Sequence, residues 1–102
     1  MTWAEFIVRP APALDRSRAG SVVVIEGRRD RIRLCPRTLP GPEIRITVPS
    51  SQFEARRREI GDVLRSGGAV AITRWGAIDG VLWTDAAEAA FEAAIAAERE
   101  GV

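Results

Sequence analysis

The sequence predicts an α+β fold, a small sheet with a helix packed on it, flanked by an N-terminal β-hairpin extension and a C-terminal helix. Three observations predict it. Short runs of β-branched residues are separated by turn residues, a helix-like run spans residues 51–66, and an Ala-rich run spans residues 86–99. The 102 residues can build one modest core but not two ordinary domains.

The first 42 residues are expected to form an irregular arm and a hairpin. Proline interrupts the arm and leaves space for a short strand at residues 5–8. Residues 21–26 and 31–35 read as two strands around a turn, with Ile32 and Leu34 on the buried face. The arginines of this hairpin could extend a phosphate-binding surface, or its strands could join the main sheet; a solvated face is the plainer interpretation.

Residues 43–84 form the second expected unit, after a proline-rich linker at 36–42. Its first strand covers residues 43–48. Simple alternation would place the side chains of this strand's three aliphatic residues on one face, namely Ile44, Ile46 and Val48.

A helix and two more strands should follow within the same unit. Ser51 and Glu54 have the spacing of a capping box, so the helix is expected to begin there and to end at Gly67. Residues 69–73 and 78–83 are expected to be strands on either side of a tight turn.

Residues 85–102 form an acidic C-terminal unit. Asp85 and Glu88 have capping spacing, and the alanine-rich run at 86–99 predicts a helix. Its apolar face is mostly alanine, so a lone copy would bury little surface. We therefore expect this helix to dock on its own domain, pair with another subunit or clamp a partner.

The composition argues against an enzyme. The chain has no His and a single cysteine, Cys35, so it lacks the commonest general base, the commonest metal ligand and any intrachain disulfide. No paired carboxylates stand out. We expect no cofactor and no metal, and a structural role for Cys35.

A charge gradient lies beneath the formal net charge of +1. Residues 1–42 carry +4, residues 43–84 carry +1 and residues 85–102 carry −4, and every cation is arginine. Guanidinium groups suit bidentate contact with phosphate or guanine. This distribution is typical of a protein that meets nucleic acid at one end and a basic partner at the other, although ordinary solvated charge explains it as well.

Neither a membrane span nor a signal peptide is expected. No apolar run approaches the roughly 20 residues that a membrane helix needs. The first six residues lack the basic-then-apolar order of a signal peptide. The sequence therefore favours a cytoplasmic protein.

Ile-Thr-Arg-Trp-Gly at residues 72–76 is the most informative motif. It lies between two expected strands and follows the expected helix, within a strand–helix–strand–turn–strand unit. Residues 44–83 thereby resemble the Phd/YefM family of bacterial antitoxins, which are small dimeric DNA-binding autorepressors. Ile60 and Leu64 match the family's two leucine positions, and Gly76 matches its turn glycine.

The resemblance implies a homodimer that binds operator DNA and a cognate toxin. Arg74 takes the place of the motif arginine, and the family's helix arginine falls on Arg56 or Arg57, depending on the register. The implied DNA-binding residues are Ser51, Arg56, Arg57 and Arg74. The implied toxin-binding residues on the C-terminal helix are Phe91, Glu92, Ile95 and Glu98.

The residues also support a DNA contact without the resemblance. Arg56, Arg57 and Arg58 lie near a helix start, where cations oppose the helix dipole and cost about 0.3–1 kcal/mol each. An anionic ligand explains them better than folding does, whereas a solvated face with neighbouring glutamates is the plainer alternative. Trp75 departs from the family pattern: it could stack on a sugar or base, but a partly buried edge position or a dimer contact is the favoured expectation.

Two hypotheses follow. The first is an antitoxin that represses its own operator and neutralises a toxin through the C-terminal helix. The second is a non-enzymatic adaptor that keeps the dimeric fold without DNA binding. Residues 1–42 have no counterpart in the family, and residue 79 puts an acid near the expected DNA face.

Overall fold

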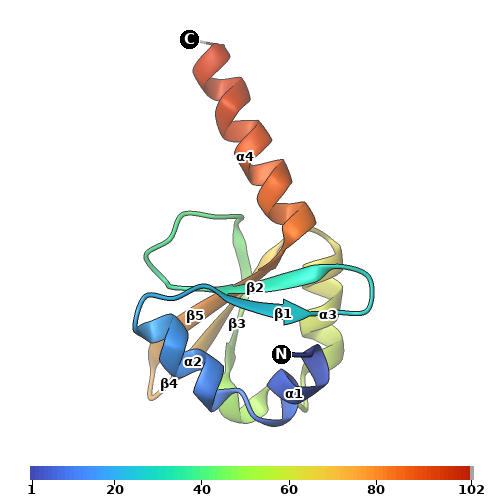
Figure 1. The fold of residues 1–102 in the computed structure, drawn as a ribbon, viewed down its shortest axis with the longest axis vertical. Helices are drawn as coiled ribbons and strands as arrows, with labels where there is room; N and C mark the ends of the chain where they lie inside the picture. Colours follow the sequence, from blue (N-terminus) through green and yellow to red (C-terminus); the bar gives the residue numbers. More distant parts are fainter. Residues whose placement is uncertain (102) are drawn as a thin grey trace.

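A five-stranded mixed sheet with the strand order β1-β2-β5-β4-β3 forms the centre of the molecule. The computed structural model describes residues 1–101 and confirms the α+β fold (Figure 1). The strands are β1 (Val23–Glu26), β2 (Arg31–Cys35), β3 (Ile44–Pro49), β4 (Ala69–Arg74) and β5 (Ala77–Thr84). The helices are α1 (Trp3–Val8), α2 (Ala11–Arg18), α3 (Arg57–Arg65) and α4 (Asp85–Glu100), with a short 3-10 helix η1 (Ser50–Gln52).

The predicted hairpin is confirmed, and it joins the main sheet. Strand β1 pairs antiparallel with β2, and β2 pairs antiparallel with β5 through Leu34 and Leu82. On its other edge β5 pairs antiparallel with β4, and α3 provides the crossover by which β3 pairs parallel with β4. The segment before residue 43 therefore supplies two of the five strands.

Each face of the sheet has its own cluster of buried side chains. Helices α1, α2 and α3 pack on the first face, and the main residues there are Phe6, Leu14, Ile25, Leu34, Val48, Phe53, Ile60, Val70, Ile72 and Leu82. The second cluster is Cys35, Ala69, Ala71, Val81, Trp83 and Ala87. The linker between β2 and β3 lies against Trp83 there, since a Cβ on Gly41 would come within 2.5 Å of the indole ring.

The N-terminal arm is helical, so the prediction of an irregular arm with a strand at residues 5–8 was wrong. The Thr2 hydroxyl accepts a hydrogen bond from the Glu5 amide at 3.2 Å and caps α1. Phe6 and Phe53 lie edge to face, 5.1 Å between ring centroids, and Trp3 joins them. A helix of six residues has too few turns for a readable periodicity, and its burial depends on residues far along the chain.

Helix α3 begins at Arg57 and not at Ser51, so the predicted capping box is not formed. Residues 50–52 form η1, and Arg56 occupies the N-cap of α3 without a side-chain capping bond. Phe53 explains the delay, because its fully buried ring draws the chain into the aromatic cluster before the helix can start.

Two further details of the predicted elements differ. A bulge between Ile44 and Ile46 breaks the alternation of β3, so Ile44 is 44% exposed while Val48 is buried. The C-terminal helix is confirmed, but its cap is Thr84, whose hydroxyl accepts from the Ala87 amide at 3.1 Å.

The thiol of Cys35 yields a test of the second cluster. Burial raises its pKa to about 12, from an ordinary value of 9.0. At pH 8 roughly one thiol in ten thousand is then ionised, so an aromatic disulfide reagent should react with Cys35 only after unfolding. Because folding raises this pKa, the associated stability is present below pH 9 and is lost as the pH rises toward 12. Fast labelling of the folded protein at pH 8 would contradict this burial.

Candidate functional site

The β4–β5 turn presents the most exposed aromatic side chain of the described residues. Arg74 pairs with Ala77, so Trp75 and Gly76 are the two central residues of the turn, with φ angles of 50° and 78°. Such a left-handed pair matches the twist of a hairpin. Trp75 is 88% exposed, which contradicts the expectation that it is partly buried; a dimer contact stays a prediction.

Arg74 lies at the base of this turn and is held by two carboxylates. Its Nε donates to the buried Asp79, and one terminal nitrogen donates to Asp15 of α2 at 2.6 Å. The guanidinium lies 5.4 Å from the Trp75 ring centroid, and its side chain is only 11% exposed. The hydrogen bond to Asp79, and then that to Asp15, raises the pKa of Arg74. Most of its charge is therefore already neutralised within the protein.

The other predicted DNA-binding residues lie around the start of α3. Arg56 donates two hydrogen bonds to Glu59, both at 2.9 Å, and this contact lowers the pKa of the Glu59 carboxylate. Ser51 and Arg57 are brought together, because both line one shallow hollow with Glu54, Ala55 and Arg58. Arg57 and Arg58 are exposed and form no ion pair within residues 1–101.

The turn and the start of α3 lie at the same end of the molecule (Figure 1). The parallel pairing of β3 with β4 explains this, since Pro49 is opposite Thr73. The structure thus places two unpaired arginines and an exposed tryptophan at one end, whereas Arg74 and Arg56 are already occupied by carboxylates.

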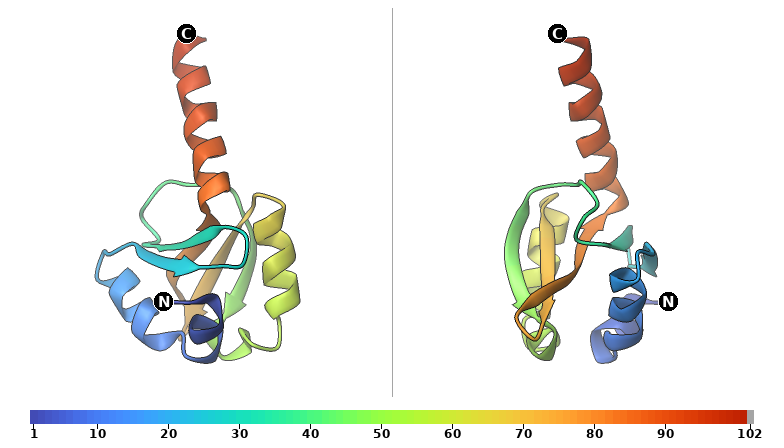
Figure 2. Two further views of the ribbon diagram at one scale, coloured as in Figure 1. Left: turned by 45° about the vertical axis from the view of Figure 1, so that its right-hand side comes forward. Right: turned by 90° about the vertical axis from the view of Figure 1, so that its left-hand side faces the viewer.

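Helix α4 projects from the opposite end of the sheet (Figure 2). The molecule accordingly measures 44 Å along its longest axis and 21 Å along its shortest. Among residues 85–100, Ala87 alone is buried. Phe91 and Ile95 are half-buried, while Glu92 and Glu98 are exposed.

The first turn of α4 is fixed firmly to the sheet. Arg33 of β2 donates to Asp85 at 2.7 Å, and the Trp83 indole donates to Glu88. Asp30, in the β1–β2 turn, accepts from the Ala86 amide at 3.2 Å. The direction of the helix is therefore set at its base, and the later turns extend without support from the body.

Sequence reasoning missed these anchoring residues and the partners of Arg74. Asp15 is 59 residues from Arg74 and lies in a helix that was not predicted. The acid at position 79, beside the expected DNA contact, is the signal in the sequence for this pairing. Nothing in the local pattern of Asp30 or Arg33 indicates a role at the base of α4.

The described residues hold no metal site of the usual kind and no membrane helix. Within residues 1–101, no three His, Cys, Asp or Glu side chains lie close enough to hold a metal ion. None of the helices described in that range combines the length and apolar character that crossing a bilayer requires.

Comparison with known proteins yields no family. No family model, curated protein or solved structure matches this chain.

Arg74→Ala should destabilise the fold, because the buried Asp79 carboxylate loses its partner. We expect the free energy of unfolding to fall by about 2 kcal/mol. Urea denaturation followed by circular dichroism measures it. Arg9→Ala, at an exposed arginine that forms no ion pair within residues 1–101, is the matched control and should change stability by less than about 0.5 kcal/mol. Equal stabilities of the two variants would show that the Arg74 network contributes nothing to folding.

Proposed function

We propose that this chain is a homodimeric DNA-binding autorepressor of the antitoxin class, acting in the cytoplasm. In this proposal one end of the molecule binds operator DNA and the other binds a toxin. One observation carries it: unpaired Arg57, Arg58 and an exposed Trp75 lie at the end opposite the uncovered helix α4.

Phosphate is the group that best fits the DNA end. Arg57 and Arg58 are in the first turn of α3, where free backbone N–H groups and the helix dipole favour an anion and disfavour cations. A phosphate there would reverse the cost of placing two arginines at the helix start. The Ser51 hydroxyl, in the same hollow, adds a neutral donor.

Arg74 has a different role in this proposal. Its bond to the buried Asp79 positions the turn, and its second carboxylate partner, Asp15, has a side chain that is 68% exposed. A phosphate that approaches the turn could displace Asp15 and leave the contact with Asp79 intact. Trp75 would then lie beside the sugar-phosphate backbone.

Helix α4 supports the partner half of the proposal. Isolated helices of about 12–15 residues or fewer are marginal in water, and the part of α4 beyond its last anchor at Glu88 runs only to Glu100. A partner that covers Phe91 and Ile95 would stabilise it, and the exposed Glu92 and Glu98 suit a basic partner surface.

The adaptor remains a second candidate because one observation favours it. Arg74 occupies the place of the motif arginine that the resemblance assigns to DNA, yet its charge is neutralised by Asp79 and Asp15. An adaptor would use α4 and Trp75 as protein contacts and would bind DNA no better than a random fragment.

Removing both free arginines should weaken DNA binding. We expect Arg57→Gln with Arg58→Gln to reduce the slope of log affinity against log salt by about 2, because two phosphate contacts are lost. Fluorescence anisotropy with a labelled fragment of the chain's own upstream DNA, at low and moderate salt, measures this.

Arg37→Gln is the control for that titration, since it removes an exposed arginine from the linker. It should leave the affinity within about twofold of the original. If the unmodified protein binds its upstream DNA no better than unrelated DNA, the adaptor is the correct reading and the autorepressor is not.

A charge on the apolar stripe of α4 should abolish neutralisation of the toxin. Phe91→Asp places a carboxylate where the partner must cover an aromatic ring, whereas Ala93→Asp adds the same charge at an exposed position of the same helix. Growth on coexpression with the product of the adjacent gene measures protection. We expect protection by the original chain and by Ala93→Asp, and none by Phe91→Asp; equal protection by all three would exclude α4 as the binding element.

A further inference from the structure

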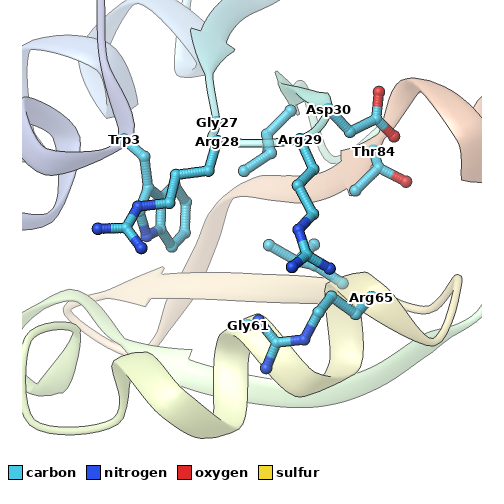
Figure 3. Close-up of a pocket in the computed structure, with 10 residues that line it drawn as sticks. Trp3, Gly27, Arg28, Arg29, Asp30, Gly61, Arg65 and Thr84 are labelled. Carbon is cyan, nitrogen blue, oxygen red and sulfur yellow. The ribbon is translucent and has the colours of Figure 1, made fainter.

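A cleft of about 460 Å³ separates the β1–β2 turn from the second half of α3 (Figure 3). Its lining residues are Trp3, Gly27, Arg28, Arg29, Asp30, Ile32, Gly61, Leu64, Arg65 and Thr84. Pockets of roughly 300–1,000 Å³ hold small organic ligands. The cleft is therefore large enough for a ligand of the size of a nucleotide, and it lies away from the Arg57 end of α3.

Three guanidinium groups reach this cleft from two different elements. Arg28 and Arg29 come from the turn and form no ion pair within residues 1–101. Arg65 comes from α3 and pairs with Asp62 of its own helix. Figure 3 shows the Arg29 side chain reaching from the turn toward α3, where the Arg65 side chain lies along the helix beside Gly61. Arg65 already has a carboxylate partner, whereas Arg28 and Arg29 have none, and an anion in the cleft would compensate their charge.

The remaining wall is apolar and partly aromatic. Trp3, Ile32 and Leu64 form it, and Gly61 leaves the adjacent surface of α3 without a side chain. A Cβ at Gly61 would already come within 3.2 Å of the Arg65 guanidinium. A flat ring system can lie against such a wall, whereas a bare inorganic anion would leave it uncovered.

We propose that this cleft binds a nucleoside monophosphate. The phosphate would lie between Arg29 and Arg65, and the base would lie against Trp3. Arg28 and Arg29 are the lining arginines without a carboxylate partner among residues 1–101, and their two cations suit the charge of nearly −2 on a phosphate monoester at neutral pH. The Thr84 hydroxyl offers a further polar contact for the sugar.

The position of Asp30 connects the cleft to α4. Asp30 follows Arg29 directly, lines the cleft, and accepts the hydrogen bond from Ala86 in the first turn of α4. A ligand that draws the β1–β2 turn toward α3 must move this carboxylate relative to α4. Nucleotide binding would thus change how the base of α4 is held, without any contribution from the Arg57 end.

Titration of the isotope-labelled protein by nuclear magnetic resonance tests the proposal. The probes are the four common nucleoside monophosphates, the matching nucleosides, inorganic phosphate and a short 5′-phosphorylated oligonucleotide. We expect saturable shifts of the Trp3 indole and the Gly61 and Ala86 amides with at least one monophosphate. Its nucleoside and inorganic phosphate should each bind at least about tenfold more weakly, since each lacks one half of the contacts.

Matched double variants locate the site. Arg28→Gln with Arg29→Gln should weaken binding by at least about tenfold, while Arg9→Gln with Arg16→Gln removes two exposed arginines elsewhere and should change nothing. Inorganic phosphate that binds as tightly as the nucleotides would overturn the proposal. So would preferential binding of the oligonucleotide, which would assign the cleft to a nucleic-acid end, or the absence of saturable shifts at Trp3 and Gly61. None of these outcomes depends on operator binding, so this experiment and the DNA titration test the two proposals independently.

Discussion

Strand β5 pairs with β2 along one edge and with β4 along the other, and this double pairing connects the first 42 residues to the rest of the molecule. Close contact reinforces it. A Cβ on Gly80 of β5 would come within 2.7 Å of Leu34 and 2.9 Å of the Ser17 hydroxyl, so α2 and β2 lie tightly against the central strand. Without the β1–β2 hairpin, the β5 strand would be a bare edge and the base of α4 would lose its bonds to Arg33 and Asp30.

The same connection determines the electrostatics at both ends. At the end that carries the β4–β5 turn, α2 brings Asp15 to Arg74, whereas Arg57 and Arg58 keep no carboxylate partner within residues 1–101. At the other end the hairpin brings Arg33 and Asp30 to the first turn of α4. The N-terminal segment therefore neutralises Arg74 and orients α4, in addition to completing the sheet.

Local signals predicted the strands well and the helices unevenly. The β-branched residues of β1 and β5 predict strands, and the alanine-rich run of α4 predicts a helix. Each run is long enough to show the pattern typical of its secondary structure. Helix α1 is not readable, since its six residues are stabilised by Trp3 and Phe6 packing on Phe53. Phe53 also delays the start of α3. The packing of this one ring therefore explains why both α1 and the first residue of α3 were mispredicted.

The candidate site was harder to predict than the fold, because charge pairing depends on tertiary distance. The motif arginine at Arg74 is recognisable from its neighbours, but its neutralisation by Asp15 requires a helix that the sequence did not reveal. Arg57 was predicted as a contact and is indeed exposed, although DNA binding by it stays a prediction.

The central claim is that α4 is a binding element held at its base and uncovered beyond it. Hydrogen–deuterium exchange of the isolated protein, followed by mass spectrometry, tests this most directly. Amides after Phe91 should exchange within seconds, while those of β4 and β5 should exchange orders of magnitude more slowly. Slow exchange along the whole of α4 would mean that the helix is already covered in the isolated protein, and it would contradict the account.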